Sequence, residues 1–414
     1  MSRGLTRAIG AVVVACAWAA SAPAQPASQT LVMWGADAPP QGTVTALDMQ
    51  GVSVMMGDGS SVTLDWTRVR DVLGARSEQF EQIRDDARAV WRAGVRLDRG
   101  DLINAEPLFE DLFERYGAQA GVTSSFVARG LLRCRLSSGA RAPAIAPWLG
   151  ALRAEGWSPG SSRSNEPGSM LDTETGLVPT LAPIWLGDEQ TAWLARQGVR
   201  PSPEKNARPG AERMRLSALS TLYTVSALYE TDPADRSAVS GELAAMYERA
   251  DPETLGEPGV ALVLEIVLSR VGQAEERASA RTALTTRLRR RPPAWTEAWI
   301  RCAIGRSLVL ESDAEVRRRG VIQLLHVPAR FEAMAPGLAS IALAEAAETM
   351  RSLGDDESGG ALRRELLERF PDSEGARWGP IVDWRRGEGV TLIDQQNIYS
   401  SAGPGPATEG NGRS

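Results

Sequence analysis

The sequence predicts a mostly α-helical protein, in which irregular helical hairpins form a solenoid and a small antiparallel β module precedes them. From residue 77 onward, apolar residues recur at three- and four-residue spacing, which is the period of an amphipathic helix. Between residues 30 and 73 the period is two, which is that of a strand. The chain of 414 residues exceeds what one core usually holds, so we expect several domains or an elongated array.

The first 24 residues have the pattern of a secretory signal. Arg3 and Arg7 precede an apolar run, and Ala22-Pro23-Ala24 is a small-residue cleavage site. In a second option, Val13 to Cys16 resembles a bacterial lipobox, so that a lipidated Cys16 is the first mature residue. Both options predict an exported protein of the periplasm or envelope. The apolar run is too short for a membrane anchor, and no transmembrane span is expected in the mature chain.

Charge and cysteine content limit the classes of partner. The net charge is −6, so the protein lacks the broad positive field that attracts phosphate backbones, and nucleic-acid binding is disfavoured. Beyond the leader, the cysteines are Cys134 and Cys302, both in apolar helical surroundings that predict buried free thiols. In an oxidising compartment the two are able to pair, and the sequence leaves that open.

Residues 30–73 predict a small β module. Apolar residues alternate in three stretches that turn signals separate at Gln50-Gly51 and at Gly57 to Ser60. We expect a three- or four-stranded meander, with Thr67 to Leu73 as a last strand or as a lead into the helices. The nearest architecture is an SH3- or Sm-like barrel. Such a module acts either as a docking site for peptides or as a cap on the helices. The alternating residues are Val44, Ala46 and Met49, then Val52, Val54 and Met56, then Val62, Leu64 and Trp66.

Helical hairpins are predicted for residues 77–156. Gly100-Asp101 separates a helix over 78–99 from one that begins at Leu102 and ends at Gly117. Two further helices are expected over 123–136 and 144–155.

The second of these helices carries a family resemblance. Gly100, Ala105, Phe109 and Leu112 fall at the spacing of the second half of a tetratricopeptide repeat, where a small residue lets two helices approach and an aromatic ring fills the gap. A similar end of a repeat is seen in LLERFPDSEGA, residues 366–376.

The resemblance covers Ser77 to Gly117 and Leu338 to Arg377, and the chain departs from the pattern within both stretches. Ala93 and Arg96 replace a glycine and an aromatic residue, and Gly359 and Arg363 replace a small residue and an aromatic one. The resemblance implies a tetratricopeptide-like solenoid of the bacterial cell envelope that binds protein or peptide partners.

Residues 157–210 interrupt the helices. Clusters of Gly, Ser and Pro lie at each end of this excursion, and a short helix is expected over 184–197. The solenoid resumes over 211–386. The final stretch, 400–414, has almost nothing to bury and is expected to be disordered. Helices within the solenoid are expected from Ala211, over 237–249, 260–271, 274–290, 294–310 and 314–325, and as a hairpin over 338–353 and 354–370.

Conventional catalytic motifs are missing from the sequence. His326 is the only histidine, which excludes two-histidine metal sites and Ser-His-Asp triads, and we expect it to pack or to cap the end of its helix. Lys205 is followed by Asn206, so the sequence has no phosphate-binding loop that ends in Gly-Lys-Ser or Gly-Lys-Thr. No catalytic, cofactor-binding or metal-binding residue is therefore predicted.

Pairs of acidic residues are the remaining route to an enzyme. Two carboxylates with stacking tryptophans suit a glycosidase, and helical toroids hold such enzymes. However, each acidic pair lies at a predicted turn or helix start, where exposed amides favour carboxylates. Trp295 and Trp299 lie four residues apart on one helix, which is typical of a core. The acidic residues are Asp85-Asp86, Asp172 with Glu174, Asp188-Glu189 and Asp355-Asp356, and the tryptophans are Trp185, Trp193, Trp295 and Trp299.

We therefore expect a noncatalytic interaction scaffold that binds partners on the concave surface of the solenoid. The alternative is a helical-toroid carbohydrate-active enzyme. A third possibility is a structural envelope component that assembles through its β module.

Overall fold

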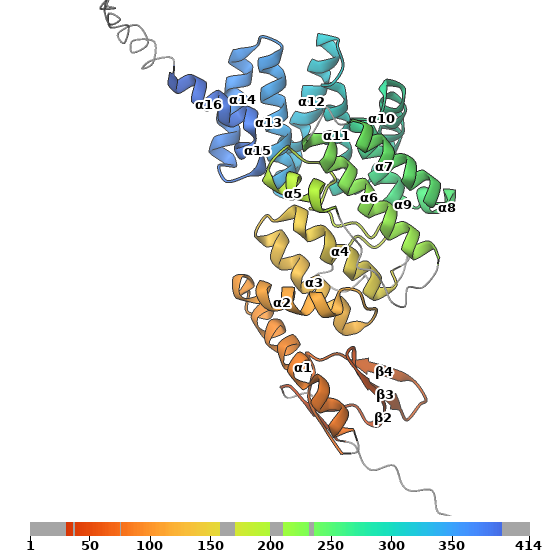
Figure 1. The fold of residues 1–414 in the computed structure, drawn as a ribbon. Coiled ribbons are helices and arrows are strands. Elements are labelled where there is room, and N and C mark those ends of the chain that lie inside the picture. Colours follow the sequence, from red (N-terminus) through yellow and green to blue (C-terminus); the bar gives the residue numbers. More distant parts are fainter. Residues whose placement is uncertain are drawn as a thin grey trace, which may run out of the picture.

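The structure is a computed structural model, and it describes residues 30–35, 38–74, 76–157, 170–198, 210–231 and 236–390. It is mostly helical, with a small antiparallel β module at the N-terminal end, as the sequence predicted (Figure 1). The expected leader, the lipobox and the tail lie outside the described residues. Within the described residues, none of the helices combines the length and the apolar character that crossing a membrane requires.

The β module contains two antiparallel sheets. β1 (Thr30–Met33) pairs with β5 (Val69–Leu73), while β2 (Gly42–Asp48), β3 (Gly51–Met56) and β4 (Ser61–Leu64) form a meander. The chain after β4 thus returns as a last strand. Gly51 makes the β2–β3 turn possible, since its φ is +141° and a Cβ there would lie 1.9 Å from the carbonyl oxygen of Leu64.

This module is joined to the helices by one core and by specific hydrogen bonds. Val52, Val54 and Trp66 are fully buried in the same cluster as Phe80 and Val90 of the first helix. Sheets of this size need such a cover on their apolar face.

Polar contacts fix the module at the start of the third helix. The Oε1 atom of Gln50 accepts from the backbone N–H of Ser124 at 3.0 Å, and the hydroxyl of Thr123 donates to the Gln50 carbonyl at 2.6 Å. These contacts hold the β2–β3 turn against the start of the third helix.

Four helices follow the module and pack in sequence order, each against the next. Ala105 and Phe109 of α2 are fully buried, and the Phe109 ring packs against Gly130, where a Cβ would lie 2.3 Å from it. The helices are α1 (Ser77–Asp98), α2 (Leu102–Tyr116), α3 (Val122–Ser137) and α4 (Arg141–Glu155).

Most of the later helices form two rows. Helices of the inner row contact one another in succession, and each packs against an outer-row helix that follows it in sequence. The inner row is α6 (Ala211–Thr231), α9 (Pro258–Val271), α11 (Ala294–Leu308) and α13 (Pro336–Ser352), and the outer row is α7 (Arg236–Arg249), α10 (Ala274–Arg289), α12 (Ala314–Phe331) and α14 (Asp356–Arg369). The short helix α8 (Pro252–Gly256) precedes α9, and α15 (Glu374–Arg377) and α16 (Gly379–Val390) follow α14.

The same glycine turn closes the first and the last hairpin of the array. Gly100 and Gly354 adopt φ of +72° and +81°, values that a residue without a side chain reaches at little cost. The next residue then donates its N–H back across the helix end, from Asp101 to Arg96 and from Asp355 to Met350. These turns are the local reason why the two ends of the array resemble each other in sequence.

The C-terminal end of the array is covered by α16. Trp384 of this helix lies within 5.5 Å of the guanidinium groups of both Arg351 and Arg363, and Gly359 leaves room for its ring. The described array therefore has a covering element at each end, as stacked repeats require.

Two predicted helix boundaries were wrong. Helix α12 continues through Pro328 to Phe331, so His326 does not cap a helix end. The helix expected over 184–197 begins only at Glu189, as α5 (Glu189–Gln197), because residues 184–186 are buried without regular secondary structure.

Candidate functional site

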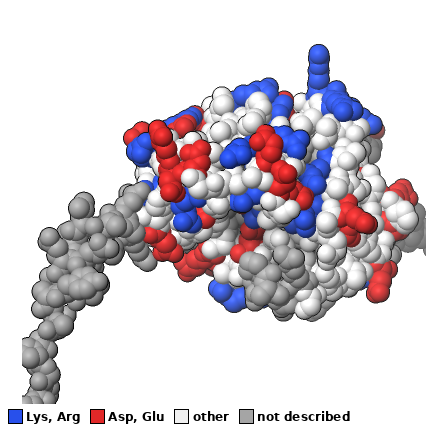
Figure 2. All heavy atoms as spheres, turned by 90° about the horizontal axis from the view of Figure 1, so that it is seen from above, with Lys and Arg blue, Asp and Glu red and all other residues white. Residues whose placement is uncertain are grey.

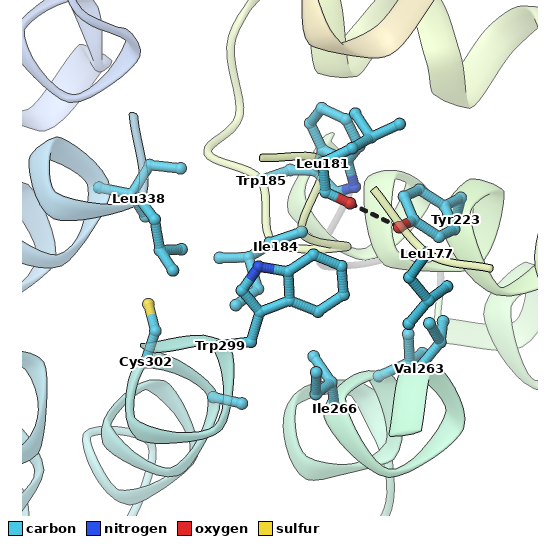
Figure 3. Close-up of a cluster of buried hydrophobic side chains, with 14 of the residues drawn as sticks. Leu177, Leu181, Ile184, Trp185, Tyr223, Val263, Ile266, Trp299, Cys302 and Leu338 are labelled. Carbon is cyan, nitrogen blue, oxygen red and sulfur yellow. Dashed lines mark hydrogen bonds between the residues drawn. The ribbon is translucent and has the colours of Figure 1, made fainter. Parts of the chain in front are cut away.

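The inner face of the array is filled by the chain itself. We call residues 170–188, which lead into α5, the strap. Leu177, Leu181, Ile184 and Trp185 of the strap are at most 1% exposed. Figure 3 shows these four side chains among residues of α6, α9, α11 and α13, namely Tyr223, Val263, Ile266, Trp299, Cys302 and Leu338. The concave surface that we expected to hold a partner is thus occupied over this stretch.

Side chains of the surrounding elements bind the main chain of the strap. Its carbonyl oxygens accept hydrogen bonds from indole, phenol, hydroxyl and guanidinium groups. The pairs are Trp148 to Gly176 (2.9 Å), Trp299 to Pro179 (2.9 Å), Tyr223 to Leu181 (2.5 Å), Arg141 to Ala182 (2.7 Å) and to Ile184 (2.9 Å), Arg306 to Trp185 (2.8 Å), and Thr191 to Leu186 (2.5 Å).

This arrangement follows from the cost of burying irregular backbone. A segment without helix or sheet partners cannot satisfy its own carbonyls, and each unpaired buried group costs about 1–3 kcal/mol. Long side chains from neighbouring helices supply the missing donors. Pro179 and Pro183 have no backbone N–H, which reduces the number of buried donors that need a partner.

A cluster of four charged side chains lies beside the strap. Arg306 contacts Glu345 at 2.7 Å and Glu230 at 3.1 Å, and Arg270 contacts Glu230 at 2.8 Å and Glu345 at 3.3 Å. The cluster is therefore neutral, and it connects α6, α9, α11 and α13. Burial by itself raises the pKa of Glu230, but the two arginines outweigh that effect and hold the pKa below its usual value.

A small cavity adjoins this cluster. It has a volume of about 10 Å³, and Ser226, Ser269, Glu230 and Arg306 are among its lining residues. That volume matches about one water molecule. The cavity therefore suits a bound water and is far too small for a sugar or peptide.

A second, partly buried ion pair joins the N-terminal helices to the end of the array. Arg141 of α4 contacts Glu374 of α15 at 2.7 Å, and the guanidinium lies 4.6 Å from the Trp185 ring centre. The other carboxylate oxygen of Glu374 accepts from the N–H of Leu186 at 2.9 Å. Burial raises the pKa of Glu374, although Arg141 opposes the rise. Both partners of this pair also contact the main chain of the strap.

The acidic candidates for catalysis are engaged locally. Asp172 accepts from the N–H and hydroxyl of Thr175, and Asp188 caps α5 through Thr191. Asp355 caps α14 through Ser358, and Asp86 pairs with Arg115 at 3.1 Å. Of the neighbouring acids, Glu189 and Asp356 lie in the first turns of helices, where carboxylates are favoured, and Asp85 and Glu174 are exposed.

The tryptophan candidates divide between core and surface. Trp185, Trp295 and Trp299 are buried, and the rings of Trp295 and Trp299 meet edge to face at 4.9 Å, so the predicted core role of that pair is confirmed. Trp193 of α5 is 41% exposed.

The remaining candidates have no catalytic partner among the described residues. His326 is half-buried, and burial together with Arg301 and Arg330 lowers its pKa. Cys134 and Cys302 are buried free thiols, and burial raises the pKa of Cys302 to about 12. In the part of the chain that the structure describes, no group of three or more His, Cys, Asp or Glu residues is placed to hold a metal ion.

Sequence reasoning missed the charged residues of the interior. A signal was present, since Glu345 is a single acid within the apolar stretch SIALAEAA and Arg306 directly follows the apolar stretch CAIG. A charge on an apolar face predicts a buried ion pair, because an isolated charge there is too costly. The partners in such a pair cannot be read from spacing.

Comparison with known proteins adds no relative: no family model, no curated protein and no solved structure matches the chain significantly.

Proposed function

We propose that the protein is an exported, noncatalytic interaction scaffold of the bacterial periplasm or cell envelope, built as a tetratricopeptide-like solenoid. The observation that supports this function best is the double row of consecutive helix pairs with a covering element at each end. Such arrays are rigid and present long surfaces for protein partners. The signal-like first 24 residues support export.

The outer row of helices is the surface we assign to partners. The strap occupies the inner face, whereas α10 with its C-cap residue and α12 carry exposed arginines, namely Arg289, Arg290, Arg318 and Arg319. On the face seen in Figure 2, basic and acidic side chains are interspersed. Mixed charge of this kind favours specific, salt-dependent protein contacts over general attraction to one sign of charge.

The local hydrogen bonds of Asp172 and Asp188 support the noncatalytic proposal over a carbohydrate-active enzyme. A general acid needs a carboxyl group that is free to reach a substrate, and these two hold turns and helix ends instead. Measuring binding of envelope polysaccharides by the wild type and by Trp193→Ala tests the alternative. Binding that depends on this exposed ring would favour it.

Affinity capture with matched surface variants tests the scaffold. The full chain, tagged and cross-linked in envelope extracts, is compared with Arg289→Glu/Arg290→Glu and with Arg318→Glu/Arg319→Glu. We expect at least one partner that is no longer captured by one of the two double variants and is still captured by the other. If all three chains capture the same proteins equally, the captured set is nonspecific and the scaffold proposal fails.

Export is tested separately. Intact mass of the chain recovered from the envelope fraction distinguishes a mature chain that begins after Ala24 from one that begins at a lipidated Cys16. A full-length chain in the cytoplasm would contradict both forms of the proposal.

A further inference from the structure

We propose that the inner face of the array is a peptide-binding groove whose resident ligand is the chain's own strap, residues 170–188. The strap and the array then relate to each other as ligand and receptor. This inference rests on the contacts of the strap and is independent of any external partner.

The strap has the chemistry of a peptide ligand. Residues 176–187, GLVPTLAPIWLG, carry no ionisable side chain. Their apolar side chains are buried between helices that come from separate hairpins (Figure 3). The two prolines limit the conformations of the free segment, so less entropy is lost when it is held.

Recognition of the strap is mostly through its backbone. Trp148, Tyr223, Trp299 and Arg306 belong to α4, α6 and α11, and each donates to a strap carbonyl. Helices in the two rows instead satisfy their carbonyls internally. Aromatic N–H and O–H donors that line a groove and bind the carbonyls of a proline-containing segment are also the means by which proteins hold separate proline-containing peptides.

The ion pairs beside the strap complete the groove. Arg141 donates to two strap carbonyls, and Glu374 accepts from a strap N–H, so a charged pair brackets residues 182–186. Because both charges are neutralised by each other, the groove favours an uncharged peptide. A partner that used this inner face would have to displace the strap, which is why we assign external partners to the outer row.

Cutting the chain on both sides of the strap tests the proposal. Protease sites are inserted into 158–169 and 199–209, so that the piece that contains residues 170–198 is no longer covalently attached. We expect the cut protein to keep its helical circular dichroism and to retain the piece in native mass spectrometry. An isotope-labelled 170–198 peptide in excess should then replace it.

Variants of the groove link the exchange to the contacts described. In the cut protein, Tyr223→Phe removes one donor to the strap and should weaken peptide retention about tenfold. Tyr247→Phe, at a tyrosine that is 44% exposed, is the matched control and should leave retention unchanged.

Two outcomes would overturn the inference. If the cut protein unfolds and added peptide does not restore it, strap and array form one inseparable core. If the cut protein stays folded but the labelled peptide never enters, even in urea just below the unfolding transition, the strap is not an exchangeable ligand.

Discussion

The two cores of the molecule satisfy their buried polar groups in different ways. In the N-terminal core, strands and helices α1 to α3 bring apolar side chains together, and most main-chain groups are paired within those regular elements. In the array core, an irregular strap crosses the centre and brings carbonyls that accept from side chains instead of from a helix or sheet. Buried arginines, indoles and a phenol are therefore concentrated around the strap, where regular structure cannot supply the donors.

This difference shows what fills a helical array. A double row of helices has an inner face that a ligand, another domain or the chain itself can cover. Here residues 170–188 cover it, and Arg306 and Glu345 lie in its polar surroundings. Four predictions test whether the two cores differ as described, in order of decreasing expected effect.

The largest effect is expected from removing a central indole in either core. Trp299→Ala leaves a cavity in the array and an unpaired carbonyl on Pro179, and Trp66→Ala does the same in the N-terminal core at Met49. Each should cost up to about 5 kcal/mol of unfolding free energy. Hydrogen exchange should show weaker protection of the inner-row helices for Trp299→Ala and of β2 to β4 for Trp66→Ala. If both variants lose hydrogen-exchange protection equally in both regions, the two cores unfold as one cooperative unit.

Removing one member of the charged cluster should rank second. Arg306→Met leaves Glu230 and Glu345 buried with only Arg270 as a counter-charge, and we expect a loss of about 3 kcal/mol in urea denaturation. Adding Glu345→Leu to Arg306→Met removes one of the two carboxylates that lost their contact with Arg306. The double variant should therefore recover much of the lost unfolding free energy. A double variant that is less stable than Arg306→Met alone would contradict the neutral-cluster description.

A single hydrogen bond to the strap should have a smaller effect. Tyr223→Phe leaves the Leu181 carbonyl without its donor and should lower the unfolding free energy by about 1–3 kcal/mol. Tyr247→Phe, on the exposed side of α7, should change it by less than about 0.5 kcal/mol. Urea denaturation of both variants gives the two losses of unfolding free energy. Equal losses would mean that the hydrogen bond from Tyr223 to the strap contributes no more than an exposed hydroxyl group.

The smallest effect concerns pH, and two buried glutamates should differ in sign. The pKa of Glu230 is held below its ordinary 4.5, so its contribution to stability is present above pH 4.5 and is lost as the pH falls through the lower folded value. The pKa of Glu374 is raised above 4.5, so the folded state binds the extra proton, and stability is lost as the pH rises from 4.5 through the folded value.

Unfolding free energy measured against pH distinguishes the two groups. Glu230→Gln should flatten the curve below pH 4.5 and Glu374→Gln should flatten it above, each by at most about 1.4 kcal/mol per pH unit. If Glu374→Gln leaves the curve above pH 4.5 unchanged, the ion pair with Arg141 keeps that carboxyl ionised.

Local signals in the sequence predicted most of the strands and helices. The two-residue period predicted the strands, the helical period predicted the hairpins, and Gly100 and Gly354 predicted the turns, because each depends on residues close together in sequence. Pro328 misled the prediction of α12, since packing of Val327, Pro328 and Phe331 in the core outweighs the lost backbone hydrogen bond.

Local sequence signals could not predict the contacts of the candidate site. Arg141 and Glu374 lie 233 positions apart, and Trp299 lies 120 positions from Pro179, so their pairing depends on how the rows of helices stack. Burial of Leu177 and Trp185 was foreseeable from their apolar character, but not the helices against which they pack.

The sequence by itself therefore determined a mostly helical chain with a β module in front, and glycine turns at Gly100 and Gly354 within the first and last hairpins. Hydrophobic period and turn chemistry are local properties, which one sequence displays. Only the tertiary structure decided that residues 170–188 occupy the inner face and that arginines, tyrosine and tryptophans bind their carbonyls. Those contacts join residues distant in sequence, and they arise because a buried irregular backbone takes its donors from whichever helices surround it.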